Sequence, residues 1–279
     1  MPETPFEIEI DGGKLHGHFG GRGIPALLLH GGPGLPDFTQ GAADELASLF
    51  TTIRYTQRGT LPSTAGAPYT VEAHMADALA ILDLFDQERA WAIGHSWGGH
   101  LALHLAVAHP ERLYGVVCID TLGASAKVMP EYEERLLASL TPEERARMKE
   151  MGERSDAGET TEEEELEQLR ALWPAMFADP AAAPAFPYQH MGVECYRETS
   201  ASVAQHFEKR TLRKGLPNVA MPVLFVHGIQ DPLPIKASVS TAKLIPGARV
   251  ARIPNCGHFP WIEQPGFLSR SIRGLIALL

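Results

Sequence analysis

Six apolar runs with helical segments between them constrain the fold of this chain more than any other feature. The runs are IPALLLHGG, TTIRYTQRG, RAWAIGHS, LYGVVCIDT, MPVLFVHGIQD and ARVARIPNCGH. A continuous apolar run is typical of a strand that is buried on both faces of a parallel sheet. Apolar residues at helical spacing occupy 71–86, 97–108, 235–244 and 266–279. Strands that alternate with helices predict an α/β fold, with a mostly parallel central sheet flanked by helices.

The first residues predict an antiparallel pair of strands. FEIEI and KLHGHF carry apolar residues at every second position, and DGG between them is suited to a turn because glycine adopts positive φ. No basic segment followed by an apolar stretch opens the sequence, and no run approaches the ~18 apolar residues of a membrane span. Neither secretion nor membrane anchoring is expected.

The stretch from residue 123 to 215 has no convincing strand and interrupts the alternation. EEEELEQLRALW has a helical pattern, while DPAAAPAFP is a connector that cannot continue a helix. We therefore predict a core domain formed by 1–122 and 216–279, with 123–215 inserted as a helical cap. Residues 130–170 hold fourteen Asp and Glu against six Lys and Arg. This acidic run reads as a solvated helix face, with the steering of cationic substrates as the alternative.

Charge and cysteine content limit the partners of the protein. The 279 residues carry a formal net charge of −10, whereas nucleic acids and anionic membranes attract basic surfaces. A small-molecule or short-peptide substrate is expected instead, with no nucleic acid and no membrane as partner. The three cysteines, Cys118, Cys195 and Cys256, are too scattered for a disulfide framework and predict reduced thiols in a cytoplasmic protein. Whether the chain forms a homo-oligomer is left open.

Ser96 lies in GHSWGG, between a predicted strand and the predicted helix at 97–108. Gly-x-Ser-x-Gly in this context is typical of a nucleophile elbow, a strained turn that exposes the serine hydroxyl. Larger side chains at Gly94 and Gly98 would collide with the neighbouring strand and helix. The alternative is an ordinary glycine-rich turn that happens to contain a serine.

A serine nucleophile needs a histidine base, and the base needs a carboxylate that fixes its tautomer. Behind a nucleophile elbow the chain order is Ser, acid, His. HGIQDP places Asp231 just past a late buried strand, and NCGHFPWIEQP places His258 after the next strand. Asp120, at the end of VVCID, is a rival for the acid because it also ends a strand. Otherwise Asp231 would cap a turn before Pro232, and His258 would be a packed loop residue.

Two backbone N–H groups are candidates for an oxyanion hole. Trp97 begins the helix after the elbow, where N–H groups lack acceptors within the helix. Gly32 follows an early strand in LLLHGGPG and would reach the same edge of the sheet. A simple Gly-Pro turn is the alternative for Gly32. The histidines in HGH at 16–18 have no partner carboxylate cluster, so no metal site is predicted.

With these residues in place, the chain resembles an α/β-hydrolase, and within that group the proline iminopeptidase family and its relatives. HGGPG at 30–34, YTQRGT at 55–60 and GHSWGG at 94–99 match that family. The resemblance covers the predicted core well and the cap poorly. Thr56 stands where the family has Asp, and GTLPSTAG lacks its Gly-x-Gly-x-Ser continuation.

The resemblance implies an α/β-hydrolase fold whose cap carries acidic residues for the α-amino group of a substrate. An ammonium that leaves water does need a carboxylate partner. Glu194 in MGVECYRETS is the best match for such a residue and Glu198 is second. An exposed helix glutamate is the alternative for each.

These residues predict a serine hydrolase that forms an acyl-enzyme and requires no cofactor. The expected substrate is a short peptide or amide with an N-terminal proline, and a carboxylic ester or lactone is the alternative. A ligand receptor with a slow hydrolase site, or a lyase that uses Ser96 and His258 without acyl transfer, belongs to another class. A serine at position 96 argues against dehalogenase and epoxide hydrolase chemistry, which resembles family members with a carboxylate nucleophile.

Overall fold

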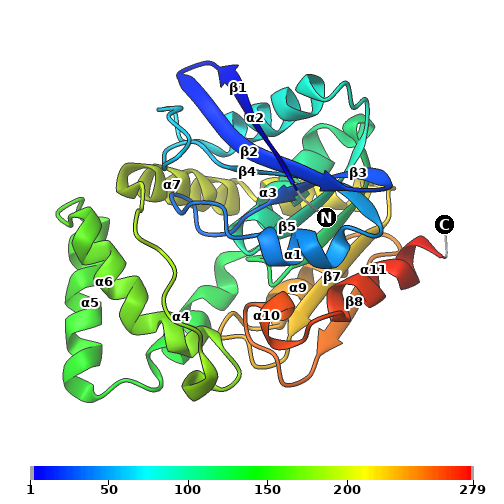
Figure 1. Cartoon of the computed structure of the whole chain (residues 1–279). Helices are drawn as coiled ribbons and strands as arrows, with labels where there is room; N and C mark the ends of the chain where they lie inside the picture. The colour runs from blue at the N-terminus through cyan, green and yellow to red at the C-terminus, as the bar shows by residue number, and fades with distance from the viewer. Residues whose placement is uncertain (1–2, 278–279) are drawn as a thin grey trace.

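An eight-stranded sheet forms the centre of the molecule in the computed structural model, which describes residues 3–277 (Figure 1). Its strands are β1 (Thr4–Ile10), β2 (Gly13–Gly21), β3 (Ile24–Leu29), β4 (Phe50–Thr56), β5 (Ala90–His95), β6 (Leu113–Ile119), β7 (Val223–Gly228) and β8 (Arg249–Ile253). The spatial order is β1-β2-β4-β3-β5-β6-β7-β8. β1 and β2 pair antiparallel, β2 pairs antiparallel with β4, and the remaining neighbours are parallel. The predicted hairpin and the six predicted strands are confirmed, but β8 is largely unburied because it lies at the edge of the sheet.

Helices cover both faces of this sheet. The α-helices of the sheet region are α1 (Gln40–Leu46), α2 (Val71–Leu84), α3 (Trp97–Ala108), α9 (Lys236–Ala242), α10 (Pro260–Glu263) and α11 (Phe267–Ile276). One buried cluster joins the sheet to α2, α3 and α9, and a second joins it to α1 and α11. The helices predicted at 71–86, 97–108, 235–244 and 266–279 are present within the described residues. The apolar patterns did not reveal α1 and α10, which have seven and four residues.

All of the regular secondary structure that is described between β6 and β7 is helical. It forms α4 (Met129–Leu137), α5 (Pro142–Asp156), α6 (Glu162–Leu172), α7 (Val193–Lys209) and α8 (Thr211–Gly215). Short 3-10 helices in this stretch are η2 (Ala126–Val128), η3 (Trp173–Met176), η4 (Pro180–Ala182) and η5 (Leu216–Asn218), while η1 (Pro110–Arg112) precedes β6. α5 and α6 project away from the sheet, whereas α7 lies beside α2 (Figure 1). The inserted helical region is thus present.

Many acidic residues of this region have structural partners. α5 and α6 each begin at a capping box, Thr141 with Glu144 and Thr161 with Glu164. Arg154 Nη1 contacts Glu164 Oε1 at 2.7 Å and so joins the two helices. These contacts agree with the interpretation of the acidic run as a solvated helix face. Among residues 3–277, no helix combines the length and apolarity needed to cross a membrane.

Candidate active site

Ser96 lies in a sharp turn between β5 and α3. Its φ of 53° and ψ of −116° put it in a region that residues other than glycine rarely adopt. Its N–H donates to the carbonyl of Ile119 at the end of β6 (2.8 Å), which fixes the turn against the neighbouring strand. The predicted nucleophile elbow therefore has the strained backbone that presents a side chain above the sheet.

The glycines on either side permit close contact between the turn and its neighbours. A Cβ at Gly98 would lie 2.0 Å from the carbonyl oxygen of Leu29 in β3. A Cβ at Gly94 would lie 2.1 Å from the carbonyl oxygen of Gly98 in α3. Both distances are far below van der Waals contact, and backbone atoms cannot move aside cheaply. The predicted collision with a strand and a helix is confirmed for these two positions.

His258 and Asp231 meet at the carboxyl edge of the sheet, as the chain order predicts. His258 Nδ1 donates to Asp231 Oδ2 at 2.9 Å, and Asp231 Oδ1 accepts from the N–H of Leu233 at 2.8 Å. Asp231 follows β7 and His258 follows β8, so the two loops end beside each other. A carboxylate on Nδ1 leaves Nε2 free as the basic nitrogen.

Burial lowers the pKa of His258 to about 3, so the imidazole is neutral at physiological pH. Its backbone is also held: the His258 N–H donates to the carbonyl of Met176 (2.7 Å). His95 Nε2 donates to the carbonyl of His258 at 2.7 Å. His95 is the residue before the nucleophile, so this contact joins the elbow to the histidine loop. Sequence reasoning missed this role of His95.

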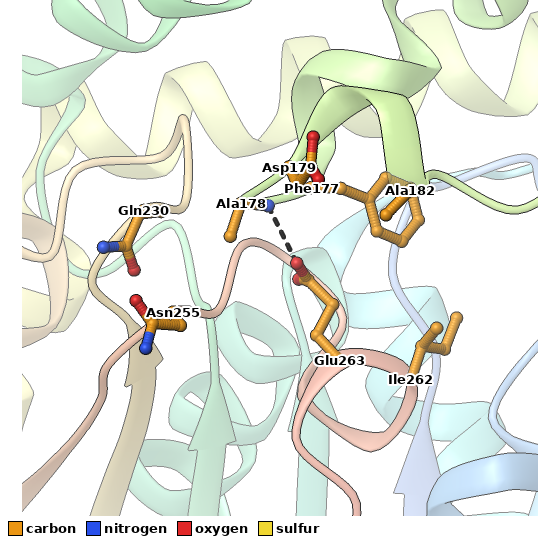
Figure 2. Close-up of a pocket in the computed structure, with 8 residues that line it drawn as sticks. All are labelled: Phe177, Ala178, Asp179, Ala182, Gln230, Asn255, Ile262 and Glu263. Atoms are coloured by element: carbon orange, nitrogen blue, oxygen red, sulfur yellow. Dashed lines mark hydrogen bonds between the residues drawn. The ribbon is translucent and has the colours of Figure 1, made fainter.

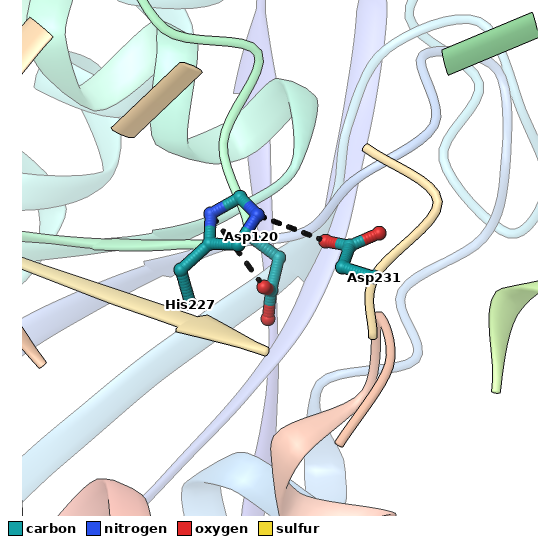
Figure 3. Close-up of side chains that lie close together, drawn as sticks. All are labelled: Asp120, His227 and Asp231. Carbon is teal, nitrogen blue, oxygen red and sulfur yellow. Dashed lines mark ion pairs between the residues drawn. The ribbon is translucent and has the colours of Figure 1, made fainter. Parts of the chain in front are cut away.

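A second carboxyl, that of Asp120, lies next to Asp231, with His227 in contact with both (Figure 3). His227 Nε2 is 3.5 Å from Asp231 Oδ2, and its Nδ1 is 3.7 Å from Asp120 Oδ1. Burial raises the pKa of both carboxyls, while their mutual contact raises that of Asp120 and lowers that of Asp231. Asp231 has a hydrogen-bond donor on each oxygen, from His258 and from Leu233, whereas Asp120 Oδ2 has no hydrogen-bond partner among the described residues.

The same three side chains have the residue types of a metal site, with ligand atoms within 4.8 Å of one another. Both ring nitrogens of His227 are already engaged, however. Nδ1 accepts from the hydroxyl of Ser238 at 2.8 Å, and Nε2 donates to the carbonyl of Leu233 at 2.8 Å. Burial lowers the pKa of His227 to about 4, as expected for a neutral ring. The donor set fits a neutral hydrogen-bond network better than a metal centre.

Trp97 and Gly32 are the candidate donors of an oxyanion hole. Trp97 is the first residue of α3, so its N–H has no acceptor within the helix. Gly32 follows β3 with a φ of 57°, and both residues line the same cavity as Ser96 and His258. Their role as oxyanion donors stays a prediction.

The Trp97 side chain connects the motifs that carried the family resemblance. Its Nε1 donates to Gln57 Oε1 at 2.8 Å, and Gln57 Nε2 donates to the carbonyl of His30 at 2.9 Å. His30 Nε2 in turn accepts from the backbone N–H of Gln57 at 2.9 Å. HGGPG, YTQRGT and GHSWGG are therefore parts of one buried network behind the site. The matching motifs pointed to these segments, but sequence reasoning did not assign Gln57 a role.

A cavity of about 250 Å³ contains Ser96 and His258. Its other walls come from the sheet loops and from the cap, and most are aromatic or aliphatic. They include Leu35, Phe38, Leu122, Met129, Tyr132, Leu169, Trp173, Met176, Phe186, Tyr188, Tyr196 and Phe259. None of the described residues that line the cavity is an Asp, Glu, Lys or Arg.

Glu194 and Glu198 lie outside this cavity. Both are exposed on α7, and Tyr196 between them is the residue of that turn that lines the cavity. Residues two positions apart in a helix do not share a face, so the two glutamates are directed elsewhere. Their predicted role as ammonium ligands has no support from this placement and stays a prediction.

Residues 25–265 match the family described as alpha/beta hydrolase fold. The chain belongs to this family. It is 28% identical to a 2-hydroxymuconate semialdehyde hydrolase of Pseudomonas putida, over 99% of this chain and 95% of the relative. It is also 28% identical to a proline iminopeptidase of Lactobacillus delbrueckii subsp. bulgaricus, over 86% and 85%.

A solved structure supports the family assignment at the level of the fold. It is an alpha/beta fold family hydrolase from Bacillus anthracis str. Sterne, with a TM-score of 0.72 and 19% identity over 98% of this chain and 99% of that one. The chain is therefore an alpha/beta-fold hydrolase, and the relatives within the family differ in the reactions that their names specify.

Proposed function

We propose that this protein hydrolyses carboxylic esters with a small, uncharged, apolar acyl group. The observation that carries this proposal is the composition of the catalytic cavity, where Ser96 and His258 are surrounded by aromatic and aliphatic side chains. A volume of about 250 Å³ falls below the roughly 300–1,000 Å³ of sites for drug-sized ligands. The cavity therefore suits a small acyl group.

The proposed reaction is double displacement. Ser96 Oγ attacks the ester carbonyl while His258 Nε2 takes the hydroxyl proton, and Asp231 stabilises the resulting imidazolium. The N–H groups of Trp97 and Gly32 bind the oxyanion of the tetrahedral intermediate. When the intermediate collapses, the C–O bond to the leaving alcohol breaks and His258 donates its proton to that oxygen. Water then attacks the acyl-enzyme by the same route and releases the acid.

An aminopeptidase that releases N-terminal proline is the rival that sequence reasoning put first. It needs a buried carboxylate for the substrate ammonium, because an unpaired charge in an apolar site is costly. No described cavity residue supplies one, and Glu194 and Glu198 are exposed. The apolar lining therefore favours the ester over the amine-bearing substrate.

The Pseudomonas putida relative has a different requirement. A hydroxymuconate is a carboxylate, and its recognition in a dry site calls for a cation. The described lining residues of the present cavity include neither Lys nor Arg. This observation supports a neutral acyl group here.

A substrate panel tests the proposal. p-Nitrophenyl butyrate should be cleaved with a kcat/KM at least about 10-fold above that for the p-nitrophenyl hemiester of succinic acid, because burying an unpaired carboxylate costs several kcal/mol. The two acyl chains have similar length, so the pair isolates charge. Faster cleavage of the succinate ester would contradict the proposal.

The same panel includes prolyl-arylamide and its N-acetylated form, which test the aminopeptidase. It also includes a lactone, which tests lactone hydrolysis. We expect both arylamides to be poorer than the butyrate ester. Three results together would establish the aminopeptidase instead. Free prolyl-arylamide would be cleaved efficiently, its N-acetylated form would not be cleaved, and Glu194→Gln would raise the KM for prolyl-arylamide roughly 10- to 100-fold.

A further inference from the structure

Glu263, the last residue of α10, points toward the backbone of Ala178 in the inserted segment (Figure 2). It is half-buried, and its carboxylate accepts two backbone hydrogen bonds from different parts of the chain. Oε2 accepts from the N–H of Gly257 at 2.6 Å, and Oε1 accepts from the N–H of Ala178 at 2.8 Å. Gly257 precedes His258, while Ala178 belongs to the segment between β6 and β7.

The two segments that Glu263 joins are also bonded directly. The carbonyl of Met176 accepts from the N–H of His258 at 2.7 Å. A Cβ on Gly257 would lie 2.3 Å from the Met176 carbonyl oxygen, so only glycine allows this approach. The rings of Phe177 and Phe259 stack at 5.4 Å between centroids. The inserted region therefore contacts the histidine loop through backbone atoms as well as through side chains.

The same inserted segment forms part of the catalytic cavity. Trp173 and Met176 line it, and so do His258 and Phe259 from the loop. A displacement of residues 173–178 would at once alter the cavity wall and remove the hydrogen bond that holds the His258 backbone. A carboxylate is suited to the link because charge-assisted hydrogen bonds from backbone N–H groups are stronger than neutral ones.

We propose that Glu263 is a positioning residue that fixes His258 to the inserted segment, so that closure of the cavity and alignment of the base are one event. A second cavity of about 410 Å³ borders this contact, and Glu263, Ala178, Gln230 and Asn255 form part of its wall (Figure 2). Glu263 touches neither Ser96 nor the catalytic cavity, and it acts through the backbone of the histidine loop.

Glu263→Gln and Glu263→Asp test the inference by different means. The first keeps the length but replaces one accepting oxygen by an amide NH₂, and the second keeps the charge but is too short to reach both N–H groups. Glu45→Gln is the matched control, because half-buried Glu45 accepts from the N–H of Ser269 in α11 at 2.8 Å and does not line the catalytic cavity. Folding of each variant is checked by near-UV circular dichroism.

The inference rests on the proposed nucleophile but not on the proposed ester, so labelling of Ser96 by a fluorophosphonate is the primary measurement. We expect both Glu263 variants to be labelled about 10- to 100-fold more slowly than the wild type, with kcat for esters lowered in parallel and KM nearly unchanged. Hydrogen exchange at the His258 amide should accelerate in the Glu263 variants and not in Glu45→Gln.

Labelling within twofold of the wild type, in a folded Glu263 variant, would overturn the inference even if its melting temperature fell. A wild type that is labelled but cleaves no ester would refute the proposed substrate class, while the comparison of labelling and exchange rates would still decide the role of Glu263. A wild type that is not labelled at all would refute the nucleophile and the inference together.

Discussion

Asp231 and Asp120 are both buried at the ends of neighbouring strands, yet only Asp231 bonds to His258. The Asp120 Oδ1 atom accepts from the N–H of Gly228 at 2.8 Å and so supports the end of β7. Sequence alone left these two residues as rivals, because each follows a buried strand. The distance to His258 Nδ1 separates them, and that distance depends on loop conformations that local sequence patterns do not encode.

Asp231→Asn should lower kcat/KM by about 10³- to 10⁴-fold, because an amide favours the wrong imidazole tautomer. Asp120→Asn should cost about 10-fold or less in kcat/KM, since Asp120 does not bond to His258 and an amide oxygen can still accept from the N–H of Gly228. Steady-state kinetics on p-nitrophenyl butyrate measure both. The assignment of the acid is wrong if Asp120→Asn is the damaging change and Asp231→Asn is mild.

The candidate catalytic residues were predictable because each lies in a local pattern with a known order. Ser96 lies in a strand-turn-helix pattern with glycines on both sides, and His258 follows the last strand. Which residues of α7 line the cavity was not predictable in this way. Glu194 and Tyr196 are neighbours in sequence, but only Tyr196 lines the cavity. Which face of α7 is turned toward the cavity depends on tertiary packing, so the short pattern ECYRE could not reveal it.

Among the helices and strands, the close contact between α3 and β3 positions Ser96 relative to the sheet. Gly98→Ala would place a methyl group 2.0 Å from the Leu29 carbonyl oxygen, so α3 must move away from the sheet. We expect a loss of about 1–3 kcal/mol in the free energy of unfolding, as in overpacked cores, together with at least about a 100-fold loss of kcat. Urea denaturation and ester hydrolysis measure the two effects.

Gly274→Ala in α11 is the matched control for that substitution. A Cβ at Gly274 meets no atom within 4 Å, and the residue is exposed in a helix. Alanine should therefore stabilise the protein by roughly 0.5–1 kcal/mol and leave kcat unchanged. Equal effects of the two substitutions would show that helix propensity, and not the contact with β3, governs position 98.

The main strands and helices followed from the sequence because their apolar spacing is long enough to be distinctive. α3 begins and ends at the predicted residues, 97 and 108. α1 and α10 are only seven and four residues long, so they contain too few turns for a periodic pattern. Their positions are set by packing, as the aromatic contact of Phe38 with Trp261 near both helices illustrates.

At the scale of the whole molecule, buried histidines make stability depend on pH. Burial is the largest cause that lowers the pKa of seven of them below the ordinary 6.5: His30, His74, His95, His100, His104, His227 and His258. The unfolded chain therefore binds more protons than the folded chain once the pH falls below about 6.5. This contribution to stability is full above pH 6.5 and declines toward the folded pKa values, such as about 4 for His100.

Three buried aspartates act in the opposite direction. The pKa of Asp77, Asp120 and Asp231 is raised by burial, so the folded chain takes up protons there before the unfolded chain does. The histidines are more numerous, so we expect the free energy of unfolding to fall by several kcal/mol between pH 7.5 and 5, at about 1.4 kcal/mol per pH unit for each excess proton. Urea denaturation at a series of pH values measures this slope.

His104→Gln should reduce that slope by about 1.4 kcal/mol per pH unit, which corresponds to one proton. The reason is that burial is the main cause that lowers the pKa of His104 to about 2. A stability that is independent of pH between 7.5 and 5 would show that the buried histidines do not control the acid response.

Covalent capture of the acyl group shows whether Ser96 is the nucleophile. During turnover of p-nitrophenyl butyrate, rapid acid quenching and peptide mass spectrometry should find a butyryl group on the peptide that contains Ser96. Ser96→Ala should keep the fold, carry no adduct and lose about 10³-fold or more of the activity. An adduct on another residue, or activity of Ser96→Ala within tenfold of the wild type, would show that Ser96 is not the nucleophile.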